Sequence, residues 1–129
     1  MTMNRLFLWL LAVTYAAFGL LFVLAPEVLA QAFTGASPQT PSGLIDMRAT
    51  YGGLNLAAGV AMALCALRTG YLQAGIALGA IMTAGLAVGR SYGMLMDGQA
   101  NSYMVIFLAI EIATIGIAGL LLRSSPETT

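Results

Sequence analysis

Residues 102–122 read SYMVIFLAIEIATIGIAGLLL and contain a single charged side chain, Glu111. A helix that crosses a bilayer needs about 20 mainly apolar residues, because the hydrocarbon core is roughly 30 Å thick. Three further segments have a similar length and composition, at residues 6–24, 44–67 and 71–96. The sequence therefore predicts an all-α membrane protein, a bundle of four transmembrane helices that forms a single domain over residues 1–129.

The composition of the whole chain excludes most other classes of protein. Of its 129 residues, 60% are hydrophobic, only 8% are charged, and none is histidine. A soluble domain carries about 25% charged residues on average, because water must wet its surface. The chain is therefore neither a soluble enzyme nor a disordered tail. Its net charge of zero offers no basic patch, so nucleic acid is not an expected partner.

The residue types also limit metal and cofactor chemistry. Without histidine, imidazole-based catalysis and the common zinc and haem sites are excluded. The acidic residues do not follow a metal-ligand spacing. Cys65 is the only cysteine, so the chain cannot form an internal disulfide. We predict no metal site and no cofactor.

The segment between the first two spans predicts a short helix followed by a loop. Pro26 stands at a helix-start position, and Gly35 follows the helix end. This helix should lie in the membrane interface. Its apolar side would consist of Val28, Leu29, Ala32 and Phe33. Residues 37–43, SPQTPSG, predict a polar loop.

The arginines predict the orientation of the chain. With four spans, both termini lie on one side of the membrane, together with Arg5, Arg68 and Arg123. The positive-inside rule makes that side cytoplasmic. Arg48 and Arg90 fall toward the opposite side and need another explanation.

Polar and small residues share a helix face with the charged residue of each of the last three spans. At 100° per residue, Arg48 shares a face with Tyr51 and Asn55. Arg90 shares one with several glycines and a threonine, and these stripes should face one another inside the bundle. We predict a polar cluster, which is also the candidate ligand-binding site, formed by Arg48, Tyr51, Asn55, Arg90 and Glu111.

Glu111 is the strongest single candidate for a functional residue. It lies roughly 12 Å into its span at 1.5 Å per residue, where an unpaired carboxylate costs several kcal/mol. It should therefore lie in the bundle interior within reach of Arg48, Arg90 or both. The alternatives are that the arginines extend to the headgroups, and that Glu111 forms an ion pair whose role is purely structural.

Glycines repeat along the third span and predict close helix packing. Gly75 and Gly79 are four residues apart, and Gly85, Gly89 and Gly93 continue at the same spacing. Small residues at this spacing allow a second helix to approach closely. We interpret these glycines as packing devices rather than ligand contacts.

Several short strings stand out in the sequence: DMRATYGGL at residues 46–54, Gly89-Arg90, Asp97-Gly98 and the acid Glu111. In these strings the chain resembles a bacterial family of small four-helix integral membrane proteins, described only as a domain of unknown function. The resemblance covers nearly the whole chain. It implies a multi-pass protein of the bacterial inner (cytoplasmic) membrane. The positive-inside rule places both termini in the cytoplasm. The resemblance implies no reaction and no catalytic residue.

Three functions are compatible with the sequence. We favour a non-enzymatic binding or accessory membrane protein. Two arginines against one glutamate would give a net positive cluster, and this cluster would hold an anionic or amphipathic group or brace a partner helix. The second is a small transporter or channel, proton-coupled through Glu111. The third is a lipid- or quinone-modifying enzyme with Glu111 as general acid or base. The expected partners are membrane lipids, a small anionic or amphipathic ligand, and a second copy of the chain or another membrane protein.

Overall fold

The computed structural model describes residues 2–124. Its elements are, in chain order, α1 (Met3–Leu24), α2 (Pro26–Thr34), α3 (Pro41–Met47), the π-helix η1 (Arg48–Gly53), α4 (Leu54–Leu67), the 3-10 turn η2 (Thr69–Tyr71), α5 (Leu72–Asp97) and α6 (Ser102–Arg123). The described residues contain no strand. The predicted all-α fold class is confirmed, including the short helix after the first span.

Four helical segments are long and apolar enough to cross a membrane: Met3–Leu24, Pro41–Leu67, Thr69–Asp97 and Ser102–Arg123. The second combines α3, η1 and α4, and the third combines η2 and α5. Much of their apolar surface is exposed, as on Leu95 and Leu120. A helix that is apolar on its outer face as well as its inner one is typical of a membrane protein.

The segment between the first two spans differs from the sequence prediction in one detail. Residues 37–43 were expected to be a loop, but α3 begins at Pro41, because the Thr40 side chain accepts a hydrogen bond from the Gly43 amide. On the predicted apolar side of α2, Val28 and Ala32 are exposed, and Leu29 and Phe33 are half-buried. The buried residues of α2 are Pro26 and Ala30. The buried side is set by the helices against which α2 packs and not by the apolar residues alone.

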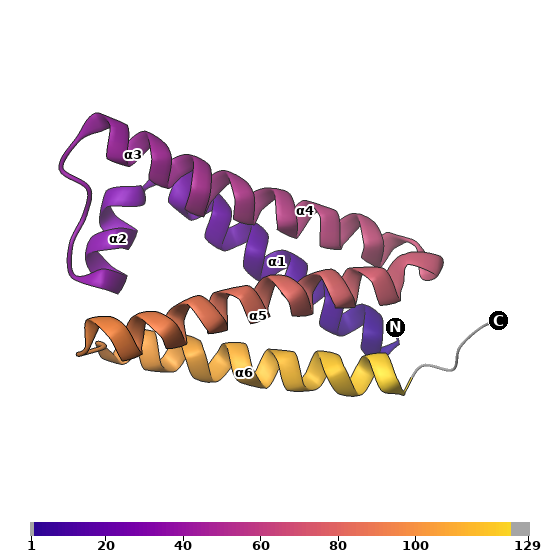
Figure 1. Ribbon diagram of the computed structural model, residues 1–129. Helices are drawn as coiled ribbons and strands as arrows, with labels where there is room; N and C mark the ends of the chain where they lie inside the picture. The colour runs from indigo at the N-terminus through magenta and orange to yellow at the C-terminus, as the bar shows by residue number, and fades with distance from the viewer. Residues whose placement is uncertain (1, 125–129) are drawn as a thin grey trace.

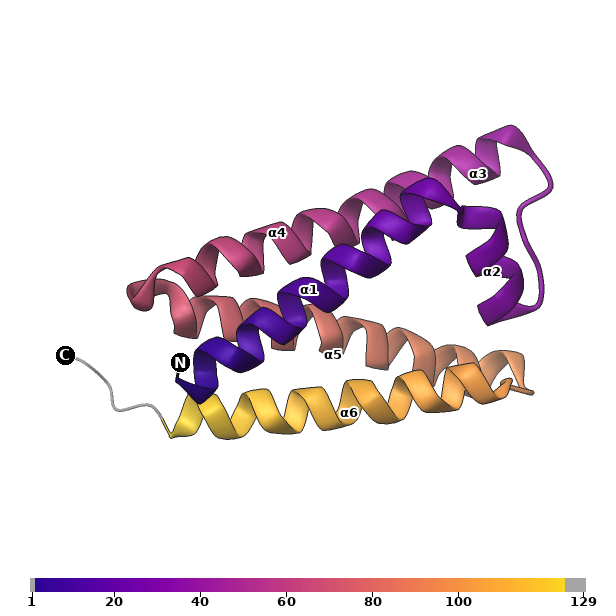
Figure 2. The ribbon, with the colours of Figure 1, turned by 180° about the vertical axis from the view of Figure 1, so that it is seen from behind.

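The four spans form two pairs that meet in the shape of a wedge (Figure 1). α1 packs along α4, and α5 packs along α6. The pairs converge near the N-terminus, η2 and the end of α6, and they diverge at the other end, where α2 lies between them (Figure 2). The core occupies the converging end, where Leu8, Met62 and Ile76 are fully buried.

Glycines set the close contact between α1 and α4. A Cβ added at Gly59 would lie 2.5 Å from the Ala16 backbone nitrogen, and a Cβ at Gly19 would meet the backbone of Leu56. Gly52 similarly faces Val23 of α1. Because the obstacles are mostly backbone atoms, any side chain at these glycines would force the two helices apart.

The glycines of α5 divide into two groups. Gly75 and Gly79 are buried against side chains of Leu8 and Leu11, so the predicted close packing is confirmed there. For Gly85 and Gly89 the packing prediction is wrong, because a Cβ at either position would have no heavy atom within 4 Å. The end of α5 that carries these glycines lies beyond the core, where the helix pairs have diverged.

Candidate functional site

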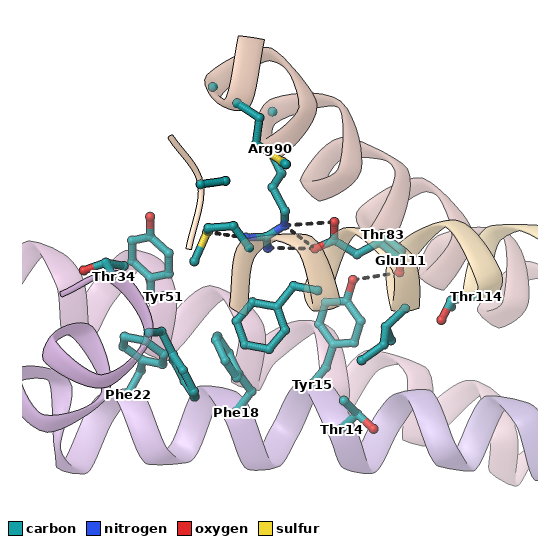
Figure 3. Close-up of a pocket in the computed structure, with 18 of the residues that line it drawn as sticks. Thr14, Tyr15, Phe18, Phe22, Thr34, Tyr51, Thr83, Arg90, Glu111 and Thr114 are labelled. Carbon is teal, nitrogen blue, oxygen red and sulfur yellow. Dashed lines mark hydrogen bonds and ion pairs between the residues drawn. The ribbon is translucent and has the colours of Figure 1, made fainter. Parts of the chain in front are cut away.

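A cavity of about 650 Å³ lies where the two helix pairs diverge (Figure 3). Its walls come from α1, α2, η1, α5 and α6, together with the loop that joins α5 to α6. Ligand pockets in proteins commonly have volumes of about 300–1,000 Å³. The lining surface is mainly apolar, and its polar side chains are those of Thr14, Tyr15, Thr34, Tyr51, Thr83, Arg90, Asp97, Gln99, Glu111 and Thr114.

An ion pair between Arg90 of α5 and Glu111 of α6 forms part of the wall. Arg90 Nη2 donates to Glu111 Oε1 at 2.8 Å, and Nε lies 3.2 Å from Oε1 and 3.1 Å from Oε2. The side chains are only 19% and 9% exposed. Two donor nitrogens on one carboxylate form a bidentate contact, which is the strongest geometry for this pair.

Two further side chains contact the Arg90 guanidinium. Nη1 lies 3.1 Å from the Met104 sulfur. The guanidinium carbon is 5.2 Å from the centre of the Phe107 ring, within the distance of a cation–π contact. Met104 and Phe107 both belong to α6, as does Glu111. One helix therefore holds the Arg90 side chain through an ion pair, a contact to sulfur and a contact to a ring.

Two hydroxyl groups form the second polar feature of the cavity. Tyr15 of α1 and Thr83 of α5 share a hydrogen bond of 3.0 Å. Both residues are buried and both line the cavity. This bond links the two helix pairs just where they begin to diverge, beside Glu111 in Figure 3.

Besides Tyr15, five aromatic rings among the described residues line the cavity, and a further ring, that of Tyr103, packs against two of them. We call them the aromatic cluster: Phe18, Phe22, Phe33, Tyr51, Tyr103 and Phe107. Phe33 of α2 connects the two sides, since its ring centre lies 6.1 Å from that of Phe18 and 5.3 Å from that of Phe107. Asn101 Nδ2 also donates to the Phe33 carbonyl at 2.8 Å. α2 is thereby fastened across the opening between the helix pairs.

The chain matches a known protein family over nearly its whole length. Residues 3–122 match the family described as "Domain of unknown function (DUF4345)". The chain belongs to the DUF4345 family. The match spans all four apolar helices and every residue that lines the cavity. No curated protein and no solved structure matches the chain.

The residues of the predicted polar cluster lie in different places in this DUF4345 chain. Tyr51, Arg90 and Glu111 line the cavity, whereas Arg48 and Asn55 do not. Arg48 instead donates to the carbonyl oxygens of Val23 and Leu24 at the end of α1, and Asn55 donates to the Tyr51 carbonyl at 2.8 Å.

Arg48 and Asn55 each donate to backbone carbonyls instead of pointing into the cavity. The last carbonyls of a helix have no partner within it, and a basic side chain can supply one. The Tyr51 carbonyl belongs to the π-helix η1, where the regular α-helical bonding is interrupted. Arg48 therefore holds η1 against the end of α1, whereas Asn55 forms a bond within its own helix, between α4 and η1.

The charge of the cavity differs from the net positive cluster expected from the sequence. Among the described residues that line it, one basic side chain, Arg90, stands against two acidic ones, Glu111 and Asp97. Arg48 was included in the predicted cluster and Asp97 was not. Charge alone therefore gives this cavity no preference for a carboxylate or a phosphate.

The predicted site did not include Tyr15, Thr83 or, apart from Tyr51, the residues of the aromatic cluster. A signal existed on α1, where Tyr15, Phe18 and Phe22 follow one helix face at spacings of three and four. No comparable signal places Phe33 of α2 against α6. Among residues 2–124, no group of three or more Cys, Asp or Glu side chains is arranged to hold a metal ion.

Proposed function

We propose that this protein binds a lipophilic or amphipathic small molecule within the membrane, in the cavity between the two helix pairs. The observation that carries the proposal is the cavity itself, about 650 Å³ in volume, with a mainly apolar lining and a few fixed polar groups. Such a combination is typical of small-molecule sites, where apolar contacts supply affinity and polar groups set orientation.

The exposed part of the lining indicates where the ligand enters. Thr14 of α1 and Ile110 of α6 both line the cavity and are both exposed on the outside of the protein. The cavity therefore reaches the protein surface at α1 and α6, in addition to the α5–α6 loop, where residues 97–100 of the lining are also exposed. In a membrane protein the surface at α1 and α6 faces lipid, so the ligand reaches the cavity from the bilayer.

The ion pair favours binding over proton-coupled transport or acid–base catalysis. Both alternatives require a Glu111 carboxylate that is free to exchange a proton, whereas both of its oxygens accept hydrogen bonds from Arg90. The pair also connects α5 to α6 along the cavity wall. In a binding protein its role is to keep this wall rigid.

The proposed location is the bacterial inner membrane with both termini in the cytoplasm. Arg5, Arg68 and Arg123 lie near the converging end of the wedge, where Arg5 Nη2 donates to Thr69 Oγ1 at 3.0 Å. The positive-inside rule assigns that end to the cytoplasm. The cavity then lies in the outer half of the bilayer.

Single cysteines should report this orientation in a chain whose Cys65 is replaced by alanine. Ser42→Cys, before α4, should react with a membrane-impermeant maleimide added to intact cells. Gly70→Cys, in η2, should react only after the cells are permeabilised. Both positions are exposed, so accessibility alone does not separate them. The opposite labelling pattern would reverse the topology.

Filling the cavity should remove its ligand. Gly89 lines the cavity and has no heavy atom within 4 Å of an added Cβ, so Gly89→Phe should fold and occupy the space. Gly85→Phe is the matched control, because Gly85 is equally open, one turn earlier on α5, and outside the lining. Mass spectrometry of the small molecules that co-purify with each variant provides the measurement.

We expect a molecule that is retained by the parent and by Gly85→Phe and reduced at least tenfold in Gly89→Phe. Equal retention by all three proteins would mean that the molecule binds elsewhere, for instance as annular lipid. The proposed function would be overturned if the parent protein retained no molecule and if no quinone, phosphate or ammonium probe stabilised it against thermal unfolding.

A further inference from the structure

We propose that the ligand of this cavity is a neutral lipophile with a flat, oxygen-bearing ring, the chemistry of a membrane quinone or quinol. The inference rests on the proposed function and specifies its ligand class. Three features of the cavity carry it: the neutralised arginine, the pair of buried hydroxyls and the aromatic cluster.

The first feature is that Arg90 does not form a receptor for an anion. Glu111 accepts from its Nε and Nη2, Met104 lies against Nη1, and Phe107 covers one face. Glu111 already supplies the counter-charge of Arg90, so a phosphate or carboxylate would add a second negative charge beside a pair that has no net charge. Asp97, the other charged residue of the lining, also repels an anion. Anionic headgroups are therefore disfavoured.

The second feature is a hydroxyl hydrogen that has no acceptor among the residues described, 2–124. Tyr15 and Thr83 carry one hydroxyl hydrogen each, and their mutual bond uses one of the two. The other hydrogen is available to an acceptor in the cavity, whichever hydroxyl donates in the mutual bond. A carbonyl or ether oxygen on the ligand satisfies it without introducing charge.

The third feature is the set of rings beside this donor. Phe18 and Phe107 approach the cavity from α1 and α6, and Phe33 lies between them. Aromatic side chains favour offset-stacked or edge-on contacts with another flat ring. A ring placed among them can direct an oxygen toward the Tyr15–Thr83 pair, and an apolar chain attached to it can leave toward lipid between Thr14 and Ile110.

A lipophilic cation is the main competitor, because aromatic faces attract cations as well as rings. The acidic group nearest to the hydroxyl pair is Glu111, and Arg90 already neutralises it. Asp97 is exposed at the far end of α5 and can be balanced by water and salt. The cavity therefore provides no buried, unpaired negative charge that would offset the cost of removing a cation from water.

Three probes with the same ten-carbon chain separate these classes: a decyl-substituted benzoquinone, decyl phosphate and decyltrimethylammonium. Each is titrated into the purified full-length protein in uncharged detergent micelles, and thermal unfolding gives the affinity. We expect the quinone to bind at least tenfold more tightly than either charged probe. Gly89→Phe should abolish its stabilising effect, and Gly85→Phe should retain it.

A double variant tests where the ring binds. Tyr15→Phe or Thr83→Val alone leaves one hydroxyl that still donates, so each single change should alter quinone affinity less than threefold. Tyr15→Phe combined with Thr83→Val removes the donor and should weaken binding at least fivefold. Replacing both partners of a buried hydrogen bond with apolar groups of similar shape is nearly neutral for stability, so this variant should fold. Tyr92→Phe combined with Thr50→Val, both exposed and outside the lining, is the matched control.

The outcomes distinguish the two proposals. Stabilisation by none of the three probes counts against the binding function itself. Equal or tighter binding of the phosphate or the ammonium probe keeps the binding function and overturns the neutral ligand class. Quinone affinity that is unchanged in the double variant also overturns the inference, because the ring would then lie away from the hydroxyl pair.

Discussion

Glu111→Leu is expected to lower the free energy of unfolding by about 3–5 kcal/mol, the usual cost of removing one member of a buried ion pair. The variant leaves the Arg90 guanidinium without a counter-charge in an apolar wall, where its side chain is only 19% exposed. Arg90→Leu should cost a similar amount, since Glu111 would then be the uncompensated group. Unfolding by a graded denaturant in micelles measures the change.

The double variant Arg90→Leu with Glu111→Leu should recover most of this loss. Apolar side chains of similar size frequently replace a buried ion pair with little cost, because the desolvation penalty of both charges disappears. Glu27→Leu provides a control, since Glu27 is exposed on α2 and should change stability by less than about 0.5 kcal/mol. A Glu111→Leu protein as stable as the parent would contradict the structural role of the pair.

Gly59→Ala is expected to destabilise the protein by about 3 kcal/mol or more, beyond the usual range for overpacking. The added Cβ would lie 2.5 Å from the Ala16 nitrogen and 2.7 Å from the Ala12 carbonyl oxygen. Backbone atoms cannot move aside as a side-chain end can, so α1 and α4 would have to separate along their length. Thermal unfolding in micelles measures the change.

Gly85→Ala is the matched control for this prediction. Gly85 also lies within a long helix, but an added Cβ there has open space around it. Alanine has the higher helix propensity by about 1 kcal/mol, so this variant should be as stable as the parent or slightly more stable. Equal effects of Gly59→Ala and Gly85→Ala would show that α1 and α4 are not in close contact.

The local features of this protein could be predicted from the sequence because each depends on residues that are near one another in the chain. The four spans follow from the length of the apolar segments. α2 follows from Pro26 at its start and Gly35 at its end, where φ is +81°. For Gly59, in contrast, the sequence shows only a small residue and not the backbone of α1 against which it packs.

The candidate site could be predicted only in part, and Arg48 shows why. Arg48 and Arg90 are equivalent in the sequence, since each is a basic residue within a span and toward the side opposite the termini. Arg48 bonds to the end of α1, and Arg90 bonds to Glu111. The choice depends on how α3–η1–α4 and α5 are rotated about their axes and on which neighbour lies within reach of each side chain.

The sequence alone determined that the chain forms four apolar spans and that Glu111 needs a partner, because the cost of placing a polar group in hydrocarbon depends on the group and its depth. Only the tertiary structure decided which arginine pairs with Glu111 and whether a cavity exists. Gly19, Gly52 and Gly59 hold α1 against α4, while α5 packs along α6. The cavity arises because these two pairs meet at one end and diverge at the other, and the angle between them depends on contacts between residues far apart in the chain.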